Sequence, residues 1–223
     1  MDGLKRWALL NVLLAVCLYF VVYTISGVVT RDFLLESHGS AFCNLISALV
    51  TLPFIIFFFY RTARMLPFTV PGELSIREGA AKKLLICLLY IAIIAASSIA
   101  LNLLFTRFLP FLQTEGFSEA RNDLMGGELF VLIMSNVVVS PVLEELLYRG
   151  AVQRSFEAAI NPTAAIFLSA GLFGLFHFNL LQFLYALCCG IIIGFSYKKT
   201  GNILVPIFGH SIANLVVVLH SIL

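Results

Sequence analysis

Long stretches without a charged residue dominate the pattern of hydrophobic and polar positions along this chain of 223 residues. A helix needs about 20 predominantly apolar residues to cross the hydrocarbon core of a bilayer. Several stretches near or above that length contain no Asp, Glu, Lys or Arg, and we interpret them as membrane-spanning. The charge-free segments are 7–30, 37–60, 84–106, 129–143, 158–197 and 200–223.

The lengths of these segments predict about seven spanning helices. The first three segments and the last are each long enough for one crossing. Segment 158–197 is long enough for two crossings, separated near His177. Segment 129–143 is short by itself, but it continues past Pro141 into a helix that reaches Arg149. The expected fold is therefore all-α, a polytopic transmembrane helix bundle.

Composition agrees with a chain whose main solvent is lipid. Hydrophobic residues make up 61% of the positions and charged residues 12%, and the mean hydropathy is +1.02. Soluble domains are typically about 45–50% apolar and about 25% charged. This composition excludes an ordinary soluble domain and makes the lipid bilayer a partner. The net charge of +2 indicates no partner class by itself, and we expect no nucleic-acid partner.

The distribution of Lys and Arg predicts the orientation, because loops on the cytoplasmic side carry an excess of these residues. One predicted side carries only three of them: Arg31, Arg107 and Arg121. The other side, which includes the N-terminus, carries Lys5, Arg6, Arg61, Arg64, Arg77, Lys82, Lys83, Arg154, Lys198 and Lys199. We therefore expect a multi-pass protein of the cell membrane with its N-terminus in the cytoplasm and its C-terminus outside.

Chemistry is expected among the helices, since the hydrophilic loops 61–83 and 107–128 are too small for a soluble domain. Glu144, Glu145 and Arg149 lie within one predicted spanning helix. Charges at the bilayer centre cost about 2.5–3.5 kcal/mol each on insertion scales and usually mark function. With the membrane edge near Arg154, Glu144 lies ten residues deeper, or about 15 Å at the helical rise. The depths of the polar residues on the other helices agree to within a turn or two, which predicts a polar intramembrane cavity.

Residue spacing assigns different roles to the two adjacent carboxylates. Neighbouring positions on a helix point about 100° apart, so Glu144 and Glu145 face different directions. Glu145 and Arg149 are separated by four residues and can form a pair along the helix. Glu144 is then the carboxylate without a partner on its own helix, as suits a general base.

Two further polar residues share one helix face. His210 and Asn214 are also four residues apart, and both could donate hydrogen bonds to a developing oxyanion, each worth about 3 kcal/mol. The working hypothesis places a water between Glu144 and His177, facing a carbonyl held by His210 and Asn214.

Structural roles are the alternative for each of these residues. The Glu145–Arg149 pair can be purely structural, a lone His177 can bond to backbone at a helix end, and Asn214 can be a hydrogen bond between helices. The coincidence of polar groups on three separate helices at compatible depth favours a functional site.

Three motifs resemble those of the CAAX protease and bacteriocin-processing (CPBP) family, which includes the type II CAAX prenyl endopeptidases. Glu144-Glu145-Leu-Leu-Tyr-Arg149 matches E-E-x-x-x-R, Phe173 to His177 matches F-x-x-x-H, and His210 to Asn214 matches H-x-x-x-N/D. The resemblance covers about residues 128–216. We therefore expect three N-terminal spans with their connecting loops in 1–127 and a catalytic helical core in 128–223, packed as one membrane domain.

The resemblance implies an intramembrane endopeptidase. By motif, Glu144 and His177 would activate water, His210 and Asn214 would stabilise the oxyanion, and Glu145 and Arg149 would order the site. The family has been described both as metalloproteases and as glutamate-dependent proteases, so the cofactor is either none or Zn²⁺. Glu144, His177 and His210 would be a candidate zinc set of two histidines and one carboxylate. The absence of an H-E-x-x-H pair favours the metal-free route.

The expected substrate is a membrane-associated peptide or protein, either CAAX-like or bacteriocin-like. Family members in bacteria are linked to bacteriocin processing and self-immunity, so a non-catalytic immunity or scaffold protein is the alternative. A transporter or proton relay is a third class, because buried Glu and His also mark such pathways. The chain shows no inverted repeat of the kind found in transporters.

Overall fold

The computed structural model describes residues 2–66, 79–108, 114–115, 118–119, 122 and 127–222. Every regular element in these ranges is helical, which confirms the all-α prediction. The elements are α1 (Asp2–His38), α2 (Ser40–Met65), α3 (Ala80–Phe108), α5 (Leu129–Ile133), η3 (Met134–Val139), α6 (Ser140–Glu145), η4 (Leu146–Gln153), α7 (Arg154–Ala159), α8 (Pro162–Leu175), α9 (Leu180–Thr200) and α10 (Leu204–Ile222). About half of each predicted hydrophilic loop, 61–83 and 107–128, lies outside the described residues.

Five helical stretches are long and apolar enough to cross a membrane. They are Gly3–His38, Ser40–Met65, Ala80–Phe105, Leu129–Ala159 and Leu180–Thr200. Two further apolar helices, Pro162–Leu175 and Leu204–Leu219, coincide with predicted crossings. Both are shorter than the ~20 residues that a full crossing takes. The described chain is therefore a multi-pass membrane protein with five candidate spans, where the sequence predicted about seven.

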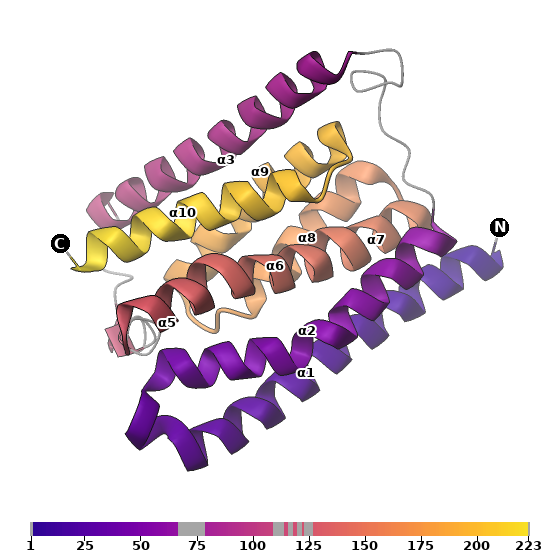
Figure 1. Cartoon of the computed structure of the whole chain (residues 1–223). Coiled ribbons are helices and arrows are strands. Elements are labelled where there is room, and N and C mark those ends of the chain that lie inside the picture. The colour runs from indigo at the N-terminus through magenta and orange to yellow at the C-terminus, as the bar shows by residue number, and fades with distance from the viewer. Residues whose placement is uncertain are drawn as a thin grey trace.

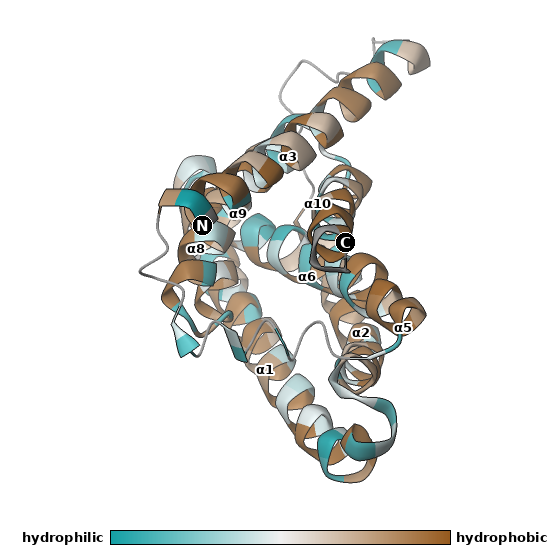
Figure 2. Cartoon of the chain, turned by 90° about the vertical axis from the view of Figure 1, so that its left-hand side faces the viewer, coloured by the Kyte–Doolittle hydropathy of each residue, from teal (hydrophilic) through white to brown (hydrophobic). Residues whose placement is uncertain are grey.

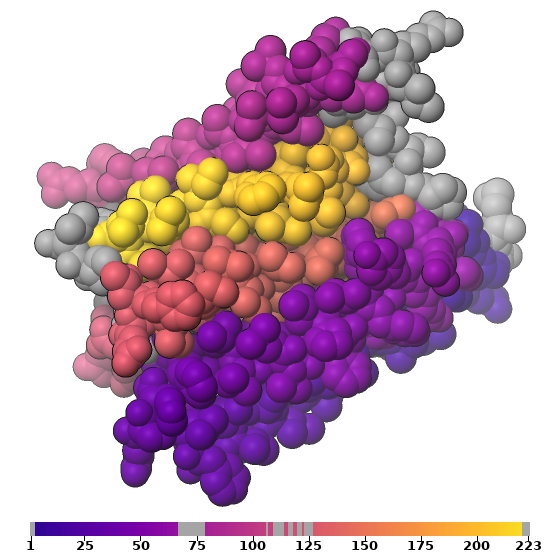
Figure 3. Space-filling view, in the orientation of Figure 1, coloured from indigo at the N-terminus to yellow at the C-terminus, as the bar shows by residue number. Residues whose placement is uncertain are grey.

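The helices form a bundle around one central helix (Figure 1). α1 and α2 pack together on one side of it, and α8 and α9 pack against each other on another. α10 lies between the central helix and α3, which forms the outer edge of the bundle (Figure 3). Most of the helical ribbon is coloured as hydrophobic in Figure 2, and many large hydrophobic side chains are exposed, as expected for side chains that face lipid.

The central helix is the segment Leu129–Ala159, which runs from α5 to α7. Its continuation past Pro141 is as predicted, but two stretches, η3 and η4, have π-helical geometry. Such wide turns are rare and are frequently found at functional sites. Pro141 has no N–H, and the N–H of Ser140 donates to Ser135 five residues back. Glu144 and Glu145 lie in the short α6 segment between the two π turns.

Local sequence sets the break between α8 and α9. Asn161 accepts a hydrogen bond from the Ala164 amide at 2.9 Å, a side-chain cap before Pro162 begins α8. Asn179 caps α9 in the same way, by accepting from the Gln182 amide at 2.9 Å. The turn between the two helices contains Phe178 at φ 54°. His177 therefore lies at the end of α8, in a turn that interrupts the long apolar segment.

Glycine allows α8 and α9 to pack closely. A Cβ atom at Gly190 would lie 3.0 Å from the Ala170 Cβ and 3.2 Å from the Phe173 ring. A Cβ atom at Gly171, on α8, would meet no atom within 4 Å. The two glycines therefore differ in whether the fold requires them.

We expect Gly190→Ala to destabilise the protein relative to Gly171→Ala. Overpacking typically costs about 1–3 kcal/mol, whereas an open helical Gly→Ala change gains up to about 1 kcal/mol from helix propensity. Thermal unfolding of the two variants in detergent micelles would measure this. Equal melting temperatures for both would contradict the close α8–α9 packing.

Candidate active site

A buried carboxylate with two cationic or titratable partners lies at the centre of the bundle. Glu145 is fully buried, with one oxygen 3.0 Å from Arg149 Nε and the other 2.8 Å from His210 Nδ1. The predicted Glu145–Arg149 pair is confirmed as an ion pair, although the Nε–H of Arg149 is not aligned to donate a hydrogen bond to Glu145. His210 comes from α10, so Glu145 joins two elements that are distant in sequence.

Arg149 links the central helix to α9 and α8. Its Nη2 donates to the carbonyl of Gly190 at 3.4 Å, and its guanidinium lies 4.9 Å from the centroid of the Phe173 ring. One helical turn later, Gln153 Nε2 donates to the carbonyl of Gly194 at 3.2 Å. A buried charge is tolerated only when it is paired and hydrogen-bonded. These contacts therefore fix η4 against α9.

Glu144 faces the other nitrogen of the same imidazole. Its Oε2 lies 3.9 Å from His210 Nε2, and its side chain is 22% exposed, whereas Glu145 is completely buried. Because a carboxylate only accepts, the His210 Nδ1 that contacts Glu145 carries a proton. His210 thus lies between both carboxylates of the E-E pair, and the one that is partly accessible is Glu144. A gap of 3.9 Å is long for a direct bond and is the kind of contact that water often bridges.

His177 lies near this group but points to its own backbone. Its Nδ1 donates to the carbonyl of Phe173 at 3.0 Å, as the structural alternative for His177 expects. The Phe173 ring packs edge-on against both imidazoles, with centroids 5.2 Å from His177 and 5.8 Å from His210. Within the described chain, no hydrogen bond or ion pair joins His177 to Glu144. With Nδ1 protonated, Nε2 of a neutral His177 is an acceptor that a water could use.

Asn214 forms a hydrogen bond between helices, which was the structural alternative for this residue. Its Nδ2 donates to the carbonyl of Asn136 at 2.8 Å, in the η3 turn. In π-helical geometry the N–H five residues ahead bonds to a carbonyl, and for Asn136 that residue is Pro141, which has no N–H. The Asn214 amide supplies a donor there. The amide has a second N–H, so the predicted role as an oxyanion donor stays a prediction.

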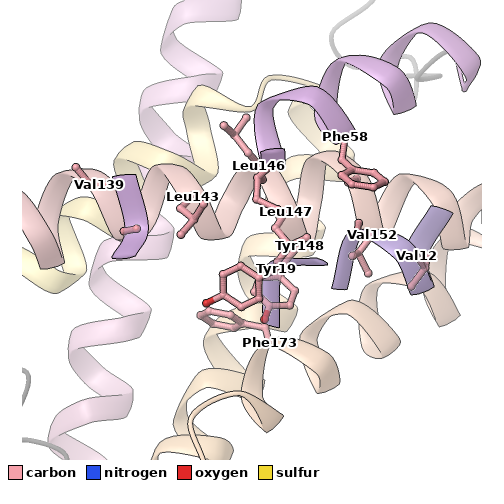
Figure 4. Close-up of a cluster of buried hydrophobic side chains, with 14 of the residues drawn as sticks. Val12, Tyr19, Phe58, Val139, Leu143, Leu146, Leu147, Tyr148, Val152 and Phe173 are labelled. Carbon is pink, nitrogen blue, oxygen red and sulfur yellow. The ribbon is translucent and has the colours of Figure 1, made fainter. Parts of the chain in front are cut away.

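The rings around the site include residues that sequence reasoning missed. Tyr148, at 1% exposure, packs edge-on against Phe173 with centroids 5.3 Å apart and against Tyr19 of α1 at 6.4 Å. Figure 4 shows these three rings gathered beside Leu147 and Leu143. The signal for Tyr148 was its position four residues after Glu144, which places both on one helix face.

The candidate zinc ligands do not form a metal site in this arrangement. Among the described residues, no group of three His, Cys, Asp or Glu side chains is placed to hold a metal ion. Glu144 and His210 face each other, and the bond from Nδ1 of His177 to its own helix leaves Nε2 as the nitrogen that could bind an ion. As placed, however, Glu144, His177 and His210 are not grouped so that all three could hold one ion.

The segment that contains Glu144, His177, His210 and Asn214 is similar to known proteins. Residues 126–216 match the family of type II CAAX prenyl endopeptidases described as Rce1-like. This part of the chain belongs to the Rce1-like family. The matched range begins near the start of the central helix and ends after Asn214, and it confirms the resemblance stated for about residues 128–216. It leaves out α1, α2 and α3.

A relative in Bacillus subtilis (strain 168) points to the same class of protein. The chain is 30% identical over 102 residues to the protein named putative membrane peptidase YdiL. The aligned part covers 46% of this chain and 41% of the relative, so the chain spans less than half of the relative's length. No solved structure matches the chain.

Removal of Arg149 should strongly destabilise the fold. Breaking a buried ion pair by removing one partner typically costs about 3–5 kcal/mol, because the other charge stays buried. We expect Arg149→Met to lower the melting temperature sharply, as measured by thermal unfolding in detergent micelles.

The matched control is the double variant Glu145→Gln/Arg149→Met, which removes both charges. It should regain part of the lost stability. A double variant no more stable than Arg149→Met alone would show that the ion pair does not dominate this contact.

Proposed function

We propose that this chain is an intramembrane endopeptidase that hydrolyses a peptide bond in a membrane-associated peptide or protein. The observation that carries the proposal is the placement of His210 between Glu144 and Glu145 within a membrane-spanning bundle. Adjacent carboxylates that differ in burial and partners suit different tasks, one as a base and one as a support. The family match of this segment names an endopeptidase.

In the proposed reaction, Glu144 acts as the general base. A water held between Glu144 and the Nε2 of His177 attacks the carbonyl carbon of the substrate, and its proton passes to Glu144. The electron pair of the C=O bond moves onto the oxygen, which accepts hydrogen bonds from His210 Nε2–H and the second N–H of Asn214. The tetrahedral intermediate then collapses. The C–N bond breaks, the leaving nitrogen takes the proton from Glu144, and a carboxylic acid and an amine result.

Glu145 and Arg149 would order this site without touching the substrate. The Glu145 carboxylate holds His210 Nδ1–H at 2.8 Å, which fixes the ring so that its Nε2 faces Glu144. Donation from Nε2 to an oxyanion requires the doubly protonated ring. Arg149 balances the charge of Glu145 and is itself held by the Gly190 carbonyl.

We propose that the site opens into a polar intramembrane cavity among α6, α10 and the turn after α8. The 22% exposure of the Glu144 side chain supports this, because Glu145 and Arg149 next to it are fully buried. Water reaches a base in a membrane protein only through such an opening, since hydrocarbon excludes it.

The orientation remains as proposed from the sequence: a protein of the cell membrane with its N-terminus in the cytoplasm and its C-terminus outside. The start of α1 and the end of α10 lie at opposite ends of the bundle, which supports an odd number of crossings (Figure 1). We further propose that 1–127 and 128–223 form one integrated domain. Tyr19 of α1 supports this by packing against both Tyr148 and Phe176 of the family segment.

We expect Glu144→Gln to abolish cleavage while the protein still folds. The change keeps the size of the side chain and removes the carboxylate that accepts the proton of water. Mass spectrometry of membrane and secreted peptides from cells that carry wild type or Glu144→Gln would measure this, and specific uncleaved precursors should accumulate in the variant. These precursors would also distinguish CAAX-like from bacteriocin-like substrates.

Glu128→Gln is the matched control, since Glu128 is exposed at the start of the same helix. It should give the wild-type peptide pattern. Identical peptides from wild type and Glu144→Gln, at equal protein levels, would overturn the peptidase proposal. A non-catalytic immunity or scaffold role would then explain an intact phenotype.

A chelator experiment separates the two routes to an activated water. The purified protein should retain its cleavage rate within about twofold in 1,10-phenanthroline, because the proposed base and donors are all side chains. Loss of cleavage that added Zn²⁺ restores would instead assign the activation of water to a metal.

A further inference from the structure

The hydroxyl of Tyr148 is buried and unpartnered among the residues that the structure describes. Tyr148 is 1% exposed, and its O–H makes no hydrogen bond within the described part of the chain. The ring is held by edge-on or tilted contacts to Phe173, Tyr19 and Phe176, with centroids 5.3, 6.4 and 6.4 Å away. A buried polar group normally finds a partner, and an exception in a native structure calls for an explanation such as catalysis.

The position of Tyr148 relative to Glu144 supplies that explanation. The two are four residues apart on the central helix, so their Cβ atoms are about 5–6 Å apart on the same face. Tyr148 also packs edge-on against Phe173, whose ring contacts the imidazoles of His177 and His210. Tyr148 therefore lies on the side of the helix that carries the proposed base.

This spacing matches what peptide hydrolysis requires. A base lies about 2.6–3.2 Å from the attacking water, and a donor lies about 2.7–3.1 Å from the oxygen that becomes negative. The attacking water and the substrate carbonyl group therefore lie between the base and the donor. Two groups one helical turn apart can hold the two ends of this arrangement.

The other proposed donors are partly committed to contacts within the protein. His210 Nδ1 is bonded to Glu145, which leaves Nε2 as a donor only in the doubly protonated ring. Asn214 donates one of its two N–H groups to the Asn136 carbonyl. The Tyr148 O–H has no such commitment and stays a donor in the neutral phenol.

We propose that the Tyr148 hydroxyl donates a hydrogen bond to the carbonyl oxygen of the scissile peptide bond, and that this bond strengthens as the oxygen becomes an oxyanion. The proton stays on Tyr148 throughout. This inference rests on the proposed endopeptidase function. It makes Tyr148 a catalytic residue that contacts the substrate, in addition to its packing role.

Tyr148→Phe tests the hydroxyl and leaves the ring contacts in place. The assay uses an internally quenched peptide that carries the cleavage site of the strongest precursor from the Glu144→Gln cells. We expect kcat to fall about 100- to 1,000-fold with KM within about twofold, as for loss of one oxyanion donor. The melting temperature should stay unchanged or rise, because the removed hydroxyl makes no hydrogen bond to any residue that the structure describes.

Tyr197→Phe is the matched control. Tyr197 is also buried, but it lies on α9 beside Arg154. Arg154 follows Glu144 by ten residues on the central helix, so Tyr197 is distant from the proposed base. Its kcat should equal that of wild type.

The outcomes separate the two proposals. If wild type cleaves, Glu144→Gln does not, and Tyr148→Phe cleaves at the wild-type rate, only the role of Tyr148 is wrong. A fall in kcat that is matched by a fall in melting temperature would make the hydroxyl structural and also overturn its role. If wild type cleaves no peptide, the proposed function fails and this inference fails with it.

Discussion

The buried Glu145 carboxylate is the interaction on which the rest of the site depends. A single charge in a bundle surrounded by lipid is costly, and one oxygen of Glu145 is ion-paired with an arginine of the same helix while the other is hydrogen-bonded to an imidazole of α10. Two further contacts of the centre involve those two partners. Arg149 needs an acceptor beyond Glu145 and finds the carbonyl of Gly190, while His210 is held with its second nitrogen facing Glu144.

This network couples packing to chemistry in a direct way. Gly190 must lack a side chain for α9 to approach α8, and that approach brings its carbonyl to Arg149. The Phe173 ring lies under the guanidinium and touches both imidazoles edge-on. The same residues that fill the core therefore also orient the charged groups. A change in packing would therefore shift the charged groups of the candidate site.

Sequence reasoning predicted the helices and the Glu145–Arg149 pair well, because lipid leaves the backbone few alternatives and a spacing of four residues brings side chains together. It could not predict which atoms meet between helices. The rotation of α10 decides that His210 contacts both carboxylates, and the turn after α8 decides that His177 bonds to Phe173. The π turns were also missed, since wide helical turns leave no regular trace in hydrophobic periodicity. Residue types alone likewise did not single out Tyr148, whose surroundings are set by α1 as well as by its own helix.

The two hydrogen bonds from α10 to the central helix have a mechanical consequence. His210 is bonded to Glu145 and Asn214 to Asn136, so α10 is pinned at two separate points along its neighbour. One pin would leave α10 able to swivel, whereas two oppose both swivelling and sliding. Rotation or sliding of α10 against the central helix therefore breaks at least one of these two bonds, so the two helices resist moving relative to each other.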